Sequence, residues 1–299
     1  MYPYYPLYGK KMVMKEQLLS FPAQHQNRQP GFEYEMNPLP ISENPEYRGT
    51  GKLSGKIAVI SGGDSGIGRA AALAFAKEGA KLSIIYLNED QDAEWTKQRI
   101  ETLGGECLLI RTDLRNSDAS KQVIEKTVGQ FGGVDIIVNN CGVQYVQQSL
   151  LDISDEQLLT TFQTNIFSFF YLTRAALPHL KPGSSIINTA SVTAYRGSKT
   201  LIDYSATKGA IVSFTRALSQ NLVEQGIRVN AIAPGPIWTP LIPATFTAEN
   251  VEIFGTDMPM KRPGQPFELA PAYVYLASDD SNYMTGQVLH VGGGEMVES

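Results

Sequence analysis

Short apolar runs alternate with longer amphipathic stretches from about residue 53 onward. The runs are rich in Ile, Val and Leu and are continuously apolar, which is typical of strands buried on both faces of a sheet. The stretches between them show helical periodicity. We predict strands at 57–60, 82–86, 108–111, 136–138, 186–188, 229–232 and 288–291. We predict helices at 67–78, 91–103, 118–130, 156–180, 205–225 and 267–277.

This alternation of strands and helices indicates an α/β fold, a doubly wound parallel sheet of Rossmann type with helices on both faces. We expect about seven strands and place this domain at 53–299. Residues 1–52 differ, because they contain seven prolines, many aromatic side chains and no sustained periodicity. We interpret them as an extended or partly disordered arm. Their aromatic residues favour an arm docked on the main domain or on a neighbouring subunit.

Composition narrows the classes of partner. The net charge of −5 and the absence of a long basic run argue against nucleic acid or an anionic membrane surface. Only two cysteines, Cys107 and Cys141, favour a reducing cytoplasm, and no apolar run reaches the length of a membrane span. His25, His179 and His290 have no ligand spacing, so we predict no metal site. We expect a soluble, cytoplasmic protein.

A glycine-rich loop follows the first predicted strand and opens the first predicted helix. Its spacing is G-x3-G-x-G, with glycines that permit a tight turn and a close approach of a pyrophosphate to the backbone. The helix N-terminus adds free N–H groups and the positive end of a dipole. We predict phosphate binding here. The candidate cofactor contacts are Gly62, Asp64, Ser65, Gly66, Ile67 and Gly68.

Two further segments sit where a cofactor cleft would lie. Asn140 and Gly142 follow the fourth predicted strand, where small and amide residues would line a crevice. Asp113, with Leu114 beside it, follows the third strand and could accept a hydrogen bond from an adenine amino group. A carboxylate at a helix N-terminus explains Asp113 equally well.

Tyr204 and Lys208 are the candidate proton-handling pair. Four residues apart on a predicted helix, they share one face, so the ammonium can lie beside the phenol. A phenol titrates near ~10, and a fixed cation nearby lowers its pKa toward the range useful for acid–base catalysis. Ser191 precedes the pair by thirteen residues. Alone, this spacing also describes a solvated helix face with one packing residue.

Taken together, these residues resemble the short-chain dehydrogenase/reductase family in its compact single-domain form, over the chain from Leu53 to the C-terminus. The matching elements occur in family order: Gly62/Gly66/Ile67/Gly68, Asp113, Asn139-Asn140-x-Gly142, Asn165, Ser191, Tyr204/Lys208 and Pro234-Gly235-Pro236-Ile237-x-Thr239. The arm, with Gln29-Pro30-Gly31 and Met36-Asn37-Pro38, is similar to that of a bacterial subgroup with such extensions.

The resemblance implies hydride transfer between a nicotinamide cofactor and the carbonyl or alcohol group of a small substrate. Tyr204 would be the general acid/base, Ser191 would bind the same substrate oxygen, and Lys208 would bind the nicotinamide ribose. Asn165 would hold a water that relays protons to Lys208, or would be a buried, satisfied amide in a long helix. The family implies a homotetramer. The nicotinamide carboxamide would lie against Pro234, Gly235, Ile237 and Thr239.

The end of the second strand departs from the family pattern and leaves the coenzyme open. An acidic residue at Tyr86 would bind the ribose diol of NAD, and a basic one at Leu87 would pair with the extra phosphate of NADP. Neither charged side chain is present. Tyr86 and Leu87 themselves remain candidate cofactor contacts. Arg69 is the only nearby candidate cation, or else a solvent-facing residue of the first helical turn. Since Glu89 and Asp90 would repel a phosphate, we favour NAD over NADP.

Three other features complete the expectation. The proline-rich segment 238–262 follows the nicotinamide loop, where a substrate lid is expected. Cys141 stands where the family usually has alanine, and we interpret it as a small hydrophobe. Gly292-Gly293-Gly294 replaces a commoner Asp-Gly-Gly and leaves its contacts open.

We therefore expect a nicotinamide-dependent oxidoreductase acting on CH–OH donors. Two alternatives stay open: an NADP-dependent aldehyde reductase, and a nucleotide-binding regulator that keeps the fold without turnover. Sugars, polyols, short ketones and aldehydes all remain candidate substrates.

Overall fold

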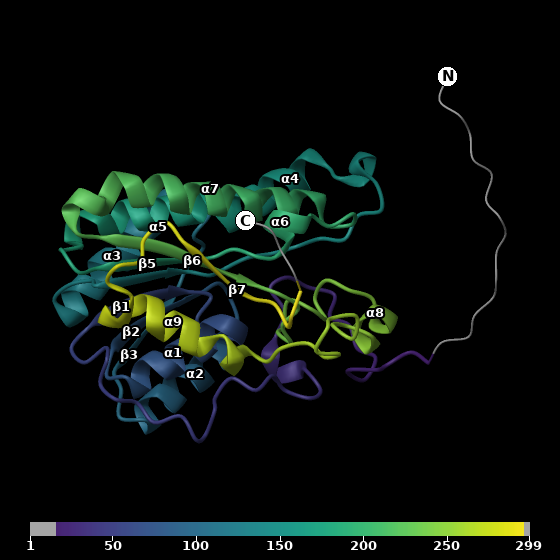
Figure 1. Ribbon diagram of the computed structural model, residues 1–299, viewed down its shortest axis with the longest axis horizontal. Coiled ribbons are helices and arrows are strands. Elements are labelled where there is room, and N and C mark those ends of the chain that lie inside the picture. The colour runs from purple at the N-terminus through teal and green to yellow at the C-terminus, as the bar shows by residue number, and fades with distance from the viewer. Residues whose placement is uncertain (1–15, 296–299) are drawn as a thin grey trace.

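Seven parallel strands form one sheet in the order β3-β2-β1-β4-β5-β6-β7 (Figure 1). The computed structural model describes residues 16–295 of the chain, so the first fifteen residues of the predicted arm lie outside the described residues. The predicted fold class is confirmed. The strands are β1 (Ile57–Ser61), β2 (Lys81–Tyr86), β3 (Cys107–Arg111), β4 (Ile136–Asn139), β5 (Ser185–Thr189), β6 (Arg228–Pro234) and β7 (Val288–Val291).

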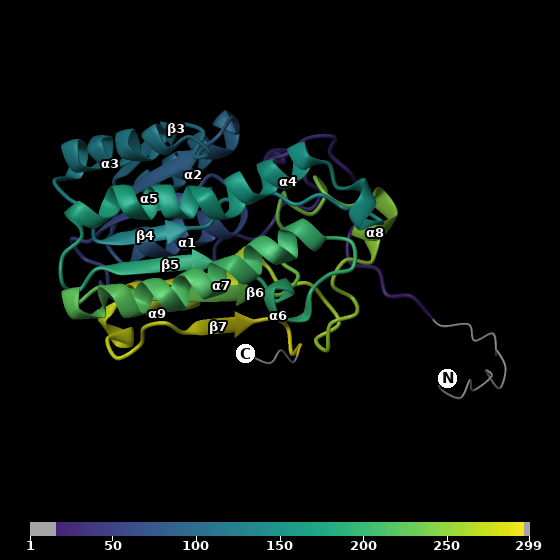
Figure 2. The ribbon, with the colours of Figure 1, turned by 90° about the horizontal axis from the view of Figure 1, so that it is seen from above.

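Helices cover both faces of the sheet, with α1, α2 and α9 on one face and α3, α5 and α7 on the other (Figures 1 and 2). Within residues 16–295, no helix is both long and apolar enough to span a bilayer. The helices are α1 (Gly66–Lys77), α2 (Asp90–Thr102), α3 (Ser117–Phe131), α4 (Asp155–Phe162), α5 (Ser168–Ala176), α6 (Thr193–Arg196), α7 (Ile202–Leu222), α8 (Ala248–Glu252) and α9 (Ala270–Ala277). Single 3₁₀ turns occupy Glu33–Glu35, Leu150–Asp152, Leu177–His179, Val223–Gln225, Pro266–Glu268 and Asp279–Ser281.

The core lies on both faces of the sheet, which explains why its strands read as continuous apolar runs. In β1, Ala58 and Ile60 belong to a buried cluster with α1 and α9, whereas Val59 belongs to a second cluster with α3 and α5. Successive side chains of a strand point to opposite faces, so most positions of a central strand are apolar.

The helix predicted at 156–180 is interrupted. A π-helical turn at Gln163–Phe167 separates α4 from α5, and a 3₁₀ turn ends the element. A π turn inserts one residue per turn without changing the apolar pattern much, so periodicity does not reveal it. Helices α6 and α8 were not predicted, because four or five residues are too few to show a period.

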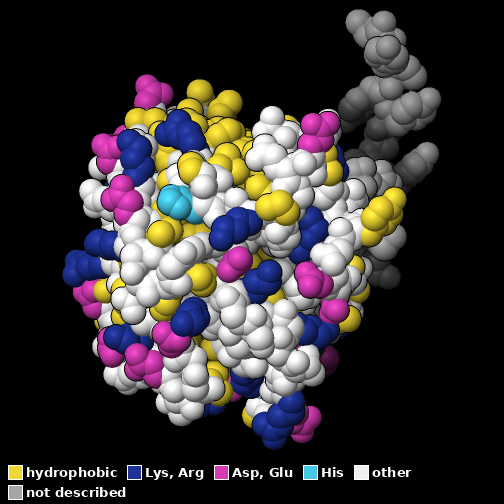
Figure 3. Space-filling view, turned by 90° about the vertical axis from the view of Figure 1, so that its left-hand side faces the viewer, with side chains coloured by type: hydrophobic (Ala, Val, Ile, Leu, Met, Phe, Trp, Pro, Cys, Tyr) yellow, Lys and Arg dark blue, Asp and Glu magenta, His cyan; other side chains and the backbone are white. Residues whose placement is uncertain are grey.

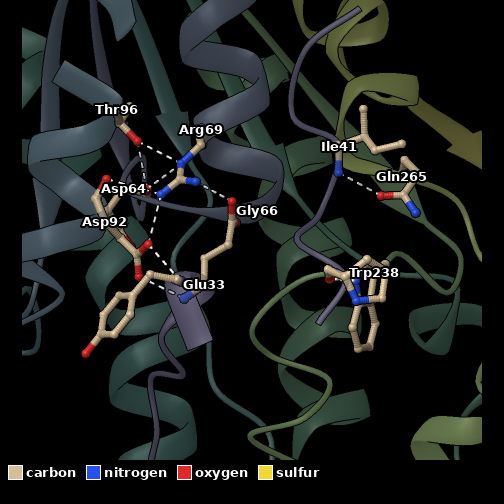
Figure 4. Close-up of polar contacts among 11 residues, drawn as sticks. Glu33, Ile41, Asp64, Gly66, Arg69, Asp92, Thr96, Trp238 and Gln265 are labelled. Carbon is tan, nitrogen blue, oxygen red and sulfur yellow. Dashed lines mark hydrogen bonds and ion pairs between the residues drawn. The ribbon is translucent and has the colours of Figure 1, made fainter. Parts of the chain in front are cut away.

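The described part of the arm, residues 16–52, lies along the main domain and is held by side-chain and backbone contacts. Phe21 stacks on Trp238 with ring centroids 3.7 Å apart, and the Trp238 indole N–H donates to the Pro38 carbonyl at 2.9 Å. Farther along, the Ile41 N–H donates to the Gln265 side-chain oxygen at 2.9 Å (Figure 4). The arm therefore reaches the segment that follows β6.

Candidate active site

A cleft of about 440 Å³ opens at the carboxyl ends of the strands. In the sheet, β1 lies between β2 and β4, so the order of the strands along the chain reverses at β1. Residues that follow β1 and β4 line the cleft. Open α/β sheets bind ligands at such a switch point. The candidate residues that line the cleft are Gly62, Asp64, Ser65, Gly66, Ile67, Tyr86, Leu87, Asp113, Leu114, Asn140, Gly142, Ser191, Tyr204, Lys208, Pro234, Gly235, Ile237 and Thr239.

The glycine loop between β1 and α1 has the geometry of a phosphate cradle. Gly62 and Gly66 have φ of +62° and +51°, a region that side chains other than glycine rarely adopt. A Cβ on Gly68 would lie 1.9 Å from the Gly62 carbonyl oxygen, so only glycine fits there. The Asn140 amide donates to the Gly62 carbonyl at 3.1 Å and secures the loop from β4. These contacts fit the pyrophosphate of a dinucleotide.

Arg69 is neither solvent-facing nor free to bind a phosphate, which corrects both predictions made for it. It is buried and forms ion pairs with Glu33 of the arm and with Asp92 of α2 (Figure 4). Its Nε also donates to the Thr96 hydroxyl at 2.8 Å. The second Glu33 oxygen accepts the Gly66 N–H at 2.6 Å. One buried carboxylate of the arm thus binds both the first turn of α1 and its arginine.

Carboxylates dominate the end of β2, where a coenzyme ribose would lie. Glu89 is buried and accepts the backbone N–H groups of Leu87 and Asn88 at 3.2 and 3.1 Å. Asp64 is buried in the glycine loop. Burial, together with the charge of Glu89, raises the pKa of Asp64 to about 7. Tyr86 lines the same end of the cleft and carries no formal charge at neutral pH.

Asp113 lies at the cleft edge after β3 and is paired with Arg115. The guanidinium donates to both carboxylate oxygens, with distances of 2.6 to 3.0 Å. Burial acts to raise the pKa of Asp113, but the hydrogen bonds from Arg115 hold it below its ordinary value. The carboxylate is ionised at neutral pH and has a cationic partner already. Leu114 beside it supplies a buried apolar wall.

Ser191, Tyr204 and Lys208 meet at the floor of the cleft. Ser191 follows β5, and the other two lie one turn apart on α7, with Lys208 Nζ 5.3 Å from the centroid of the Tyr204 ring. All three side chains are buried. Lys208 donates to the Thr189 carbonyl at 2.8 Å, its one hydrogen bond within residues 16–295. Two ammonium N–H groups are therefore available to a ligand in the cleft.

The pKa of Tyr204 lies above the ordinary value of a phenol, whereas the spacing of Tyr204 and Lys208 predicts a lowered pKa. Burial raises the pKa of the phenol to about 12, and the neighbouring Ser191 hydroxyl offsets only part of this. Burial also lowers the pKa of Lys208 to about 8. Desolvation disfavours both charged forms at once, so the ammonium does not bring the phenolate into the neutral range. At neutral pH this site holds a phenol that can donate a proton.

Asn165 lies in the π turn between α4 and α5 and is fully buried. Its side-chain oxygen accepts the Val143 N–H at 2.8 Å, and its amide donates to the Val143 carbonyl at 2.9 Å and to the Thr207 hydroxyl at 3.1 Å. The side chain therefore fixes the loop after β4 against α7. π turns occur often at functional sites, since they redirect side chains within a helix.

The loop after β6 forms the wall opposite the glycine loop. A Cβ on Gly235 would lie 2.8 Å from Gly292 Cα, so the two backbones touch, which gives the first glycine of the Gly292–Gly294 run a packing role. The Thr239 side chain packs against Gly66 across the cleft.

Burial raises the pKa of the Cys141 thiol, so it stays protonated at neutral pH.

The arm supplies cleft residues that the sequence did not predict, since Gln29, Pro30 and Gly31 line the same cleft. The Gln29 side chain bonds the Gln144 carbonyl after β4, and it reaches the Thr245 hydroxyl at 3.3 Å. The available signal was the Gln-Pro-Gly sequence, which marks a turn but not where that turn docks. Within residues 16–295, no group of three or more His, Cys, Asp or Glu side chains is arranged to hold a metal.

The switch-point cleft, the glycine cradle and the buried Ser–Tyr–Lys group define a class, the dinucleotide-binding oxidoreductases of Rossmann fold. The model of the family described as Enoyl-(Acyl carrier protein) reductase matches residues 62–295. The chain belongs to the short-chain dehydrogenase/reductase family, and it is an oxidoreductase that transfers hydride with a nicotinamide cofactor.

Known proteins similar to this chain support that assignment. The uncharacterized oxidoreductase YhxC of Bacillus subtilis is 63% identical, over 93% of this chain and 97% of that protein. The chloroplastic NADPH-dependent aldehyde reductase 1 of Arabidopsis thaliana is 50% identical, over 92% of this chain and 98% of that protein. The structure of a short chain dehydrogenase from Burkholderia cenocepacia in complex with NADP is 28% identical, with a TM-score of 0.77 over 81% of this chain and 98% of that one.

Proposed function

We propose that the protein interconverts a carbonyl compound and its alcohol, with Tyr204 as the general acid/base. The observation that carries this proposal is the meeting of Ser191, Tyr204 and Lys208, all buried, at the floor of the coenzyme cleft. A pure nucleotide-binding regulator has no use for a phenol beside an ammonium. This group therefore argues against the non-catalytic alternative.

Tyr204, Ser191 and Lys208 have separate roles in the proposed reaction. A bound nicotinamide supplies or accepts the hydride at the substrate carbon. The Tyr204 phenol, protonated at neutral pH because its pKa lies at about 12, donates to the carbonyl oxygen during reduction. The Ser191 hydroxyl donates a hydrogen bond to the same oxygen and orients the carbonyl. Lys208, with two N–H groups available, would bind the nicotinamide ribose. Asn165, which fixes the loop after β4 against α7, would hold a water that relays protons to Lys208.

The proposed cofactor contacts are residues that line the cleft, together with Gly68, which packs against Gly62 in the same loop. The glycine loop, from Gly62 through Gly68, would hold the pyrophosphate, and Asp113 with Leu114 would border the adenine. Pro234, Gly235, Ile237 and Thr239 would contact the carboxamide. We propose NAD as the preferred coenzyme, because the Glu89 carboxylate lines the ribose end and Arg69 is already paired. Carboxylates accept hydrogen bonds from a ribose diol and repel a 2′-phosphate.

The test compares NADH and NADPH with one set of carbonyl substrates, following nicotinamide absorbance. Sugars, polyols, short ketones and aldehydes should be included, since the substrate class is open. We expect turnover with both coenzymes and a higher kcat/KM with NADH. Much faster consumption of NADPH would reverse the coenzyme preference and favour an NADP-dependent aldehyde reductase, as the name of the Arabidopsis thaliana relative suggests. Coenzyme binding without turnover of any substrate would favour the regulator.

We propose a homotetramer assembled partly through the outer face of α4, α5 and α7. Phe167 and Phe170 are 37% and 49% exposed there, and Phe170 packs against Phe214 with centroids 4.2 Å apart. Figure 3 shows hydrophobic side chains gathered along the upper edge of the molecule, above a surface of interspersed charges. Large exposed aromatic side chains on neighbouring helices are typical of subunit contacts.

Replacing Phe170 by Glu should dissociate this assembly, since it places a charge in an apolar contact. Light scattering should then give a smaller mass than for the unmodified protein. Trp95→Glu is the matched control, because Trp95 is 48% exposed but lies on α2, on the opposite face of the sheet. A Phe170→Glu variant of unchanged mass would remove this face from the proposed interface.

The division of the chain and its location in the cell complete the proposal. We interpret 53–299 as the catalytic domain, residues 1–52 as its arm and 238–262 as the substrate lid. The lid is not a bare loop: it contains α8, and Trp238 at its start is fully buried. We also propose a cytoplasmic location, since Cys107 and Cys141 are both free thiols. Cell fractionation would test that location.

A further inference from the structure

The N-terminal arm forms part of the coenzyme cleft itself. Its residues Gln29, Pro30 and Gly31 line the same cleft as the glycine loop. A Cβ on Gly31 would lie 2.6 Å from the Pro240 carbonyl oxygen, so the arm backbone presses directly on the segment after β6. Gln144 donates its N–H to the Gln29 side chain at 3.3 Å and ties the arm to the loop after β4. A ligand in the cleft therefore meets the arm as one of its walls.

Arg28, one residue before this wall, reaches the end of β2. Its Nη2 donates to the Asn88 side-chain oxygen at 2.6 Å and lies 3.5 Å from a Glu89 oxygen. Its Nε donates to the Pro30 carbonyl at 2.7 Å, and its guanidinium carbon lies 3.3 Å from the centroid of the Phe32 ring. The side chain is thus held in place, while 27% of it stays exposed.

The position matters because the end of β2 is where a dinucleotide site distinguishes a ribose hydroxyl from a ribose phosphate. Tyr86 and Leu87, which line the cleft there, carry no cation. Arg69 is buried between two carboxylates, and Arg115 pairs with Asp113 after β3. Arg111, opposite Tyr86 in the sheet, forms an ion pair with Asp90 at 2.9 Å. Arg28 differs from these three arginines, because its nearest side-chain partner is the neutral amide of Asn88 and its contact with the Glu89 carboxylate is long, at 3.5 Å.

We propose that Arg28 is the residue through which this chain binds the 2′-phosphate of NADP. A 2′-phosphate offers several anionic oxygens to a planar guanidinium and would replace the Asn88 and Glu89 contacts. With an unphosphorylated ribose, Arg28 keeps its long contact with Glu89 and the site accepts NAD. The arm therefore gives a cleft lined by carboxylates the capacity to accept both coenzymes. This inference rests on the proposed function only in placing a dinucleotide in the cleft.

The test measures binding without turnover. Calorimetry would compare ADP-ribose with 2′-phospho-ADP-ribose, on the unmodified protein and on Arg28→Gln. Losing the charge-assisted bonds should weaken 2′-phospho-ADP-ribose by about tenfold to a hundredfold, while ADP-ribose changes by less than about threefold. Arg28→Lys should recover part of the lost affinity, since it restores the charge without the planar fork.

Arg48→Gln is the matched control, because Arg48 is an exposed arginine of the same arm and should alter neither affinity. An equal loss for both fragments in Arg28→Gln would assign Arg28 to holding the arm in place, and unchanged affinities would remove it from the site. Either result overturns the inference. An unmodified protein that bound neither fragment would overturn the proposed function as well. If Arg28→Gln does not fold, the comparison of Arg28→Lys with the unmodified protein decides.

Discussion

Replacing Tyr204 by Phe is expected to lower turnover by about 10²- to 10⁴-fold, the usual contribution of a positioned general acid or base. In the proposed mechanism the phenol oxygen exchanges a proton with the substrate oxygen, while the buried ring packs against the cleft. Phenylalanine keeps the ring and loses the proton. Coenzyme affinity should therefore stay within about threefold. Steady-state kinetics together with calorimetric titration of the coenzyme would separate the two effects.

Tyr195→Phe is the control for this prediction. Tyr195 is a half-buried tyrosine of α6 whose hydroxyl has no hydrogen-bond partner within residues 16–295, and it does not line the cleft. Removing its hydroxyl should leave turnover near that of the unmodified protein. Unchanged turnover in Tyr204→Phe would contradict the mechanism. Loss of coenzyme affinity in parallel with turnover would instead indicate a structural role for the phenol.

The pH dependence of the unmodified enzyme should reflect the same group. Because burial holds the pKa of Tyr204 at about 12, the phenol is protonated throughout the neutral range, and carbonyl reduction has its proton. The rate of carbonyl reduction should fall above about pH 8, where the Lys208 ammonium loses its charge. Alcohol oxidation needs the phenolate, so its rate should rise with pH from neutrality. An oxidation rate that falls as the pH rises through neutrality would contradict this assignment.

The sheet was predictable because its strands are central and buried on both faces. All of the observed strands except β7 extend the predicted ones, by one to three residues, and the added positions are often polar, as with Ser61, Ser185 and Arg228. Pairing in the ladder uses backbone groups, so a polar end residue can join without an apolar side chain. The apolar pattern therefore locates a strand but not its last residue.

Some features of the site join residues that are close together in the chain, and others join residues that are far apart. The glycine loop and the Tyr204–Lys208 pair are local patterns, and their spacing on the chain is their spacing in the fold. The pairing of Arg69 with Glu33 joins residues 36 positions apart through an arm without periodicity, so no local pattern contains it. The pKa of Tyr204 depends on burial, which spacing alone does not give.

Replacing Glu33 by Ala is expected to lower the free energy of unfolding by about 3 kcal/mol, the scale for removing one partner of a buried ion pair. Glu33 is 1% exposed, and its removal leaves the Arg69 guanidinium with Asp92 as its remaining carboxylate. It also leaves the Gly66 N–H without its acceptor at the start of α1. Urea denaturation measures the loss, and ADP-ribose titration should show weaker binding at the loosened glycine loop.

Glu35→Ala is the matched control, since Glu35 lies in the same 3₁₀ turn but is exposed, and it should change stability by less than about 0.5 kcal/mol. Equal stability of the Glu33→Ala and Glu35→Ala variants would contradict the role of the buried carboxylate.

A double-mutant cycle then separates the ion pair from the fold around it. Arg69→Met alone leaves Glu33 and Asp92 as two buried carboxylates without their cation, so it should destabilise the protein as strongly as Glu33→Ala. Burial already raises the pKa of Glu33 against the opposing effect of Arg69, and removing the arginine raises it further. Combining Glu33→Ala with Arg69→Met removes one charge of each sign. The double variant should therefore lose less stability than the sum of the single variants. Strict additivity would mean that the arm and α1 are held together by contacts other than this pair.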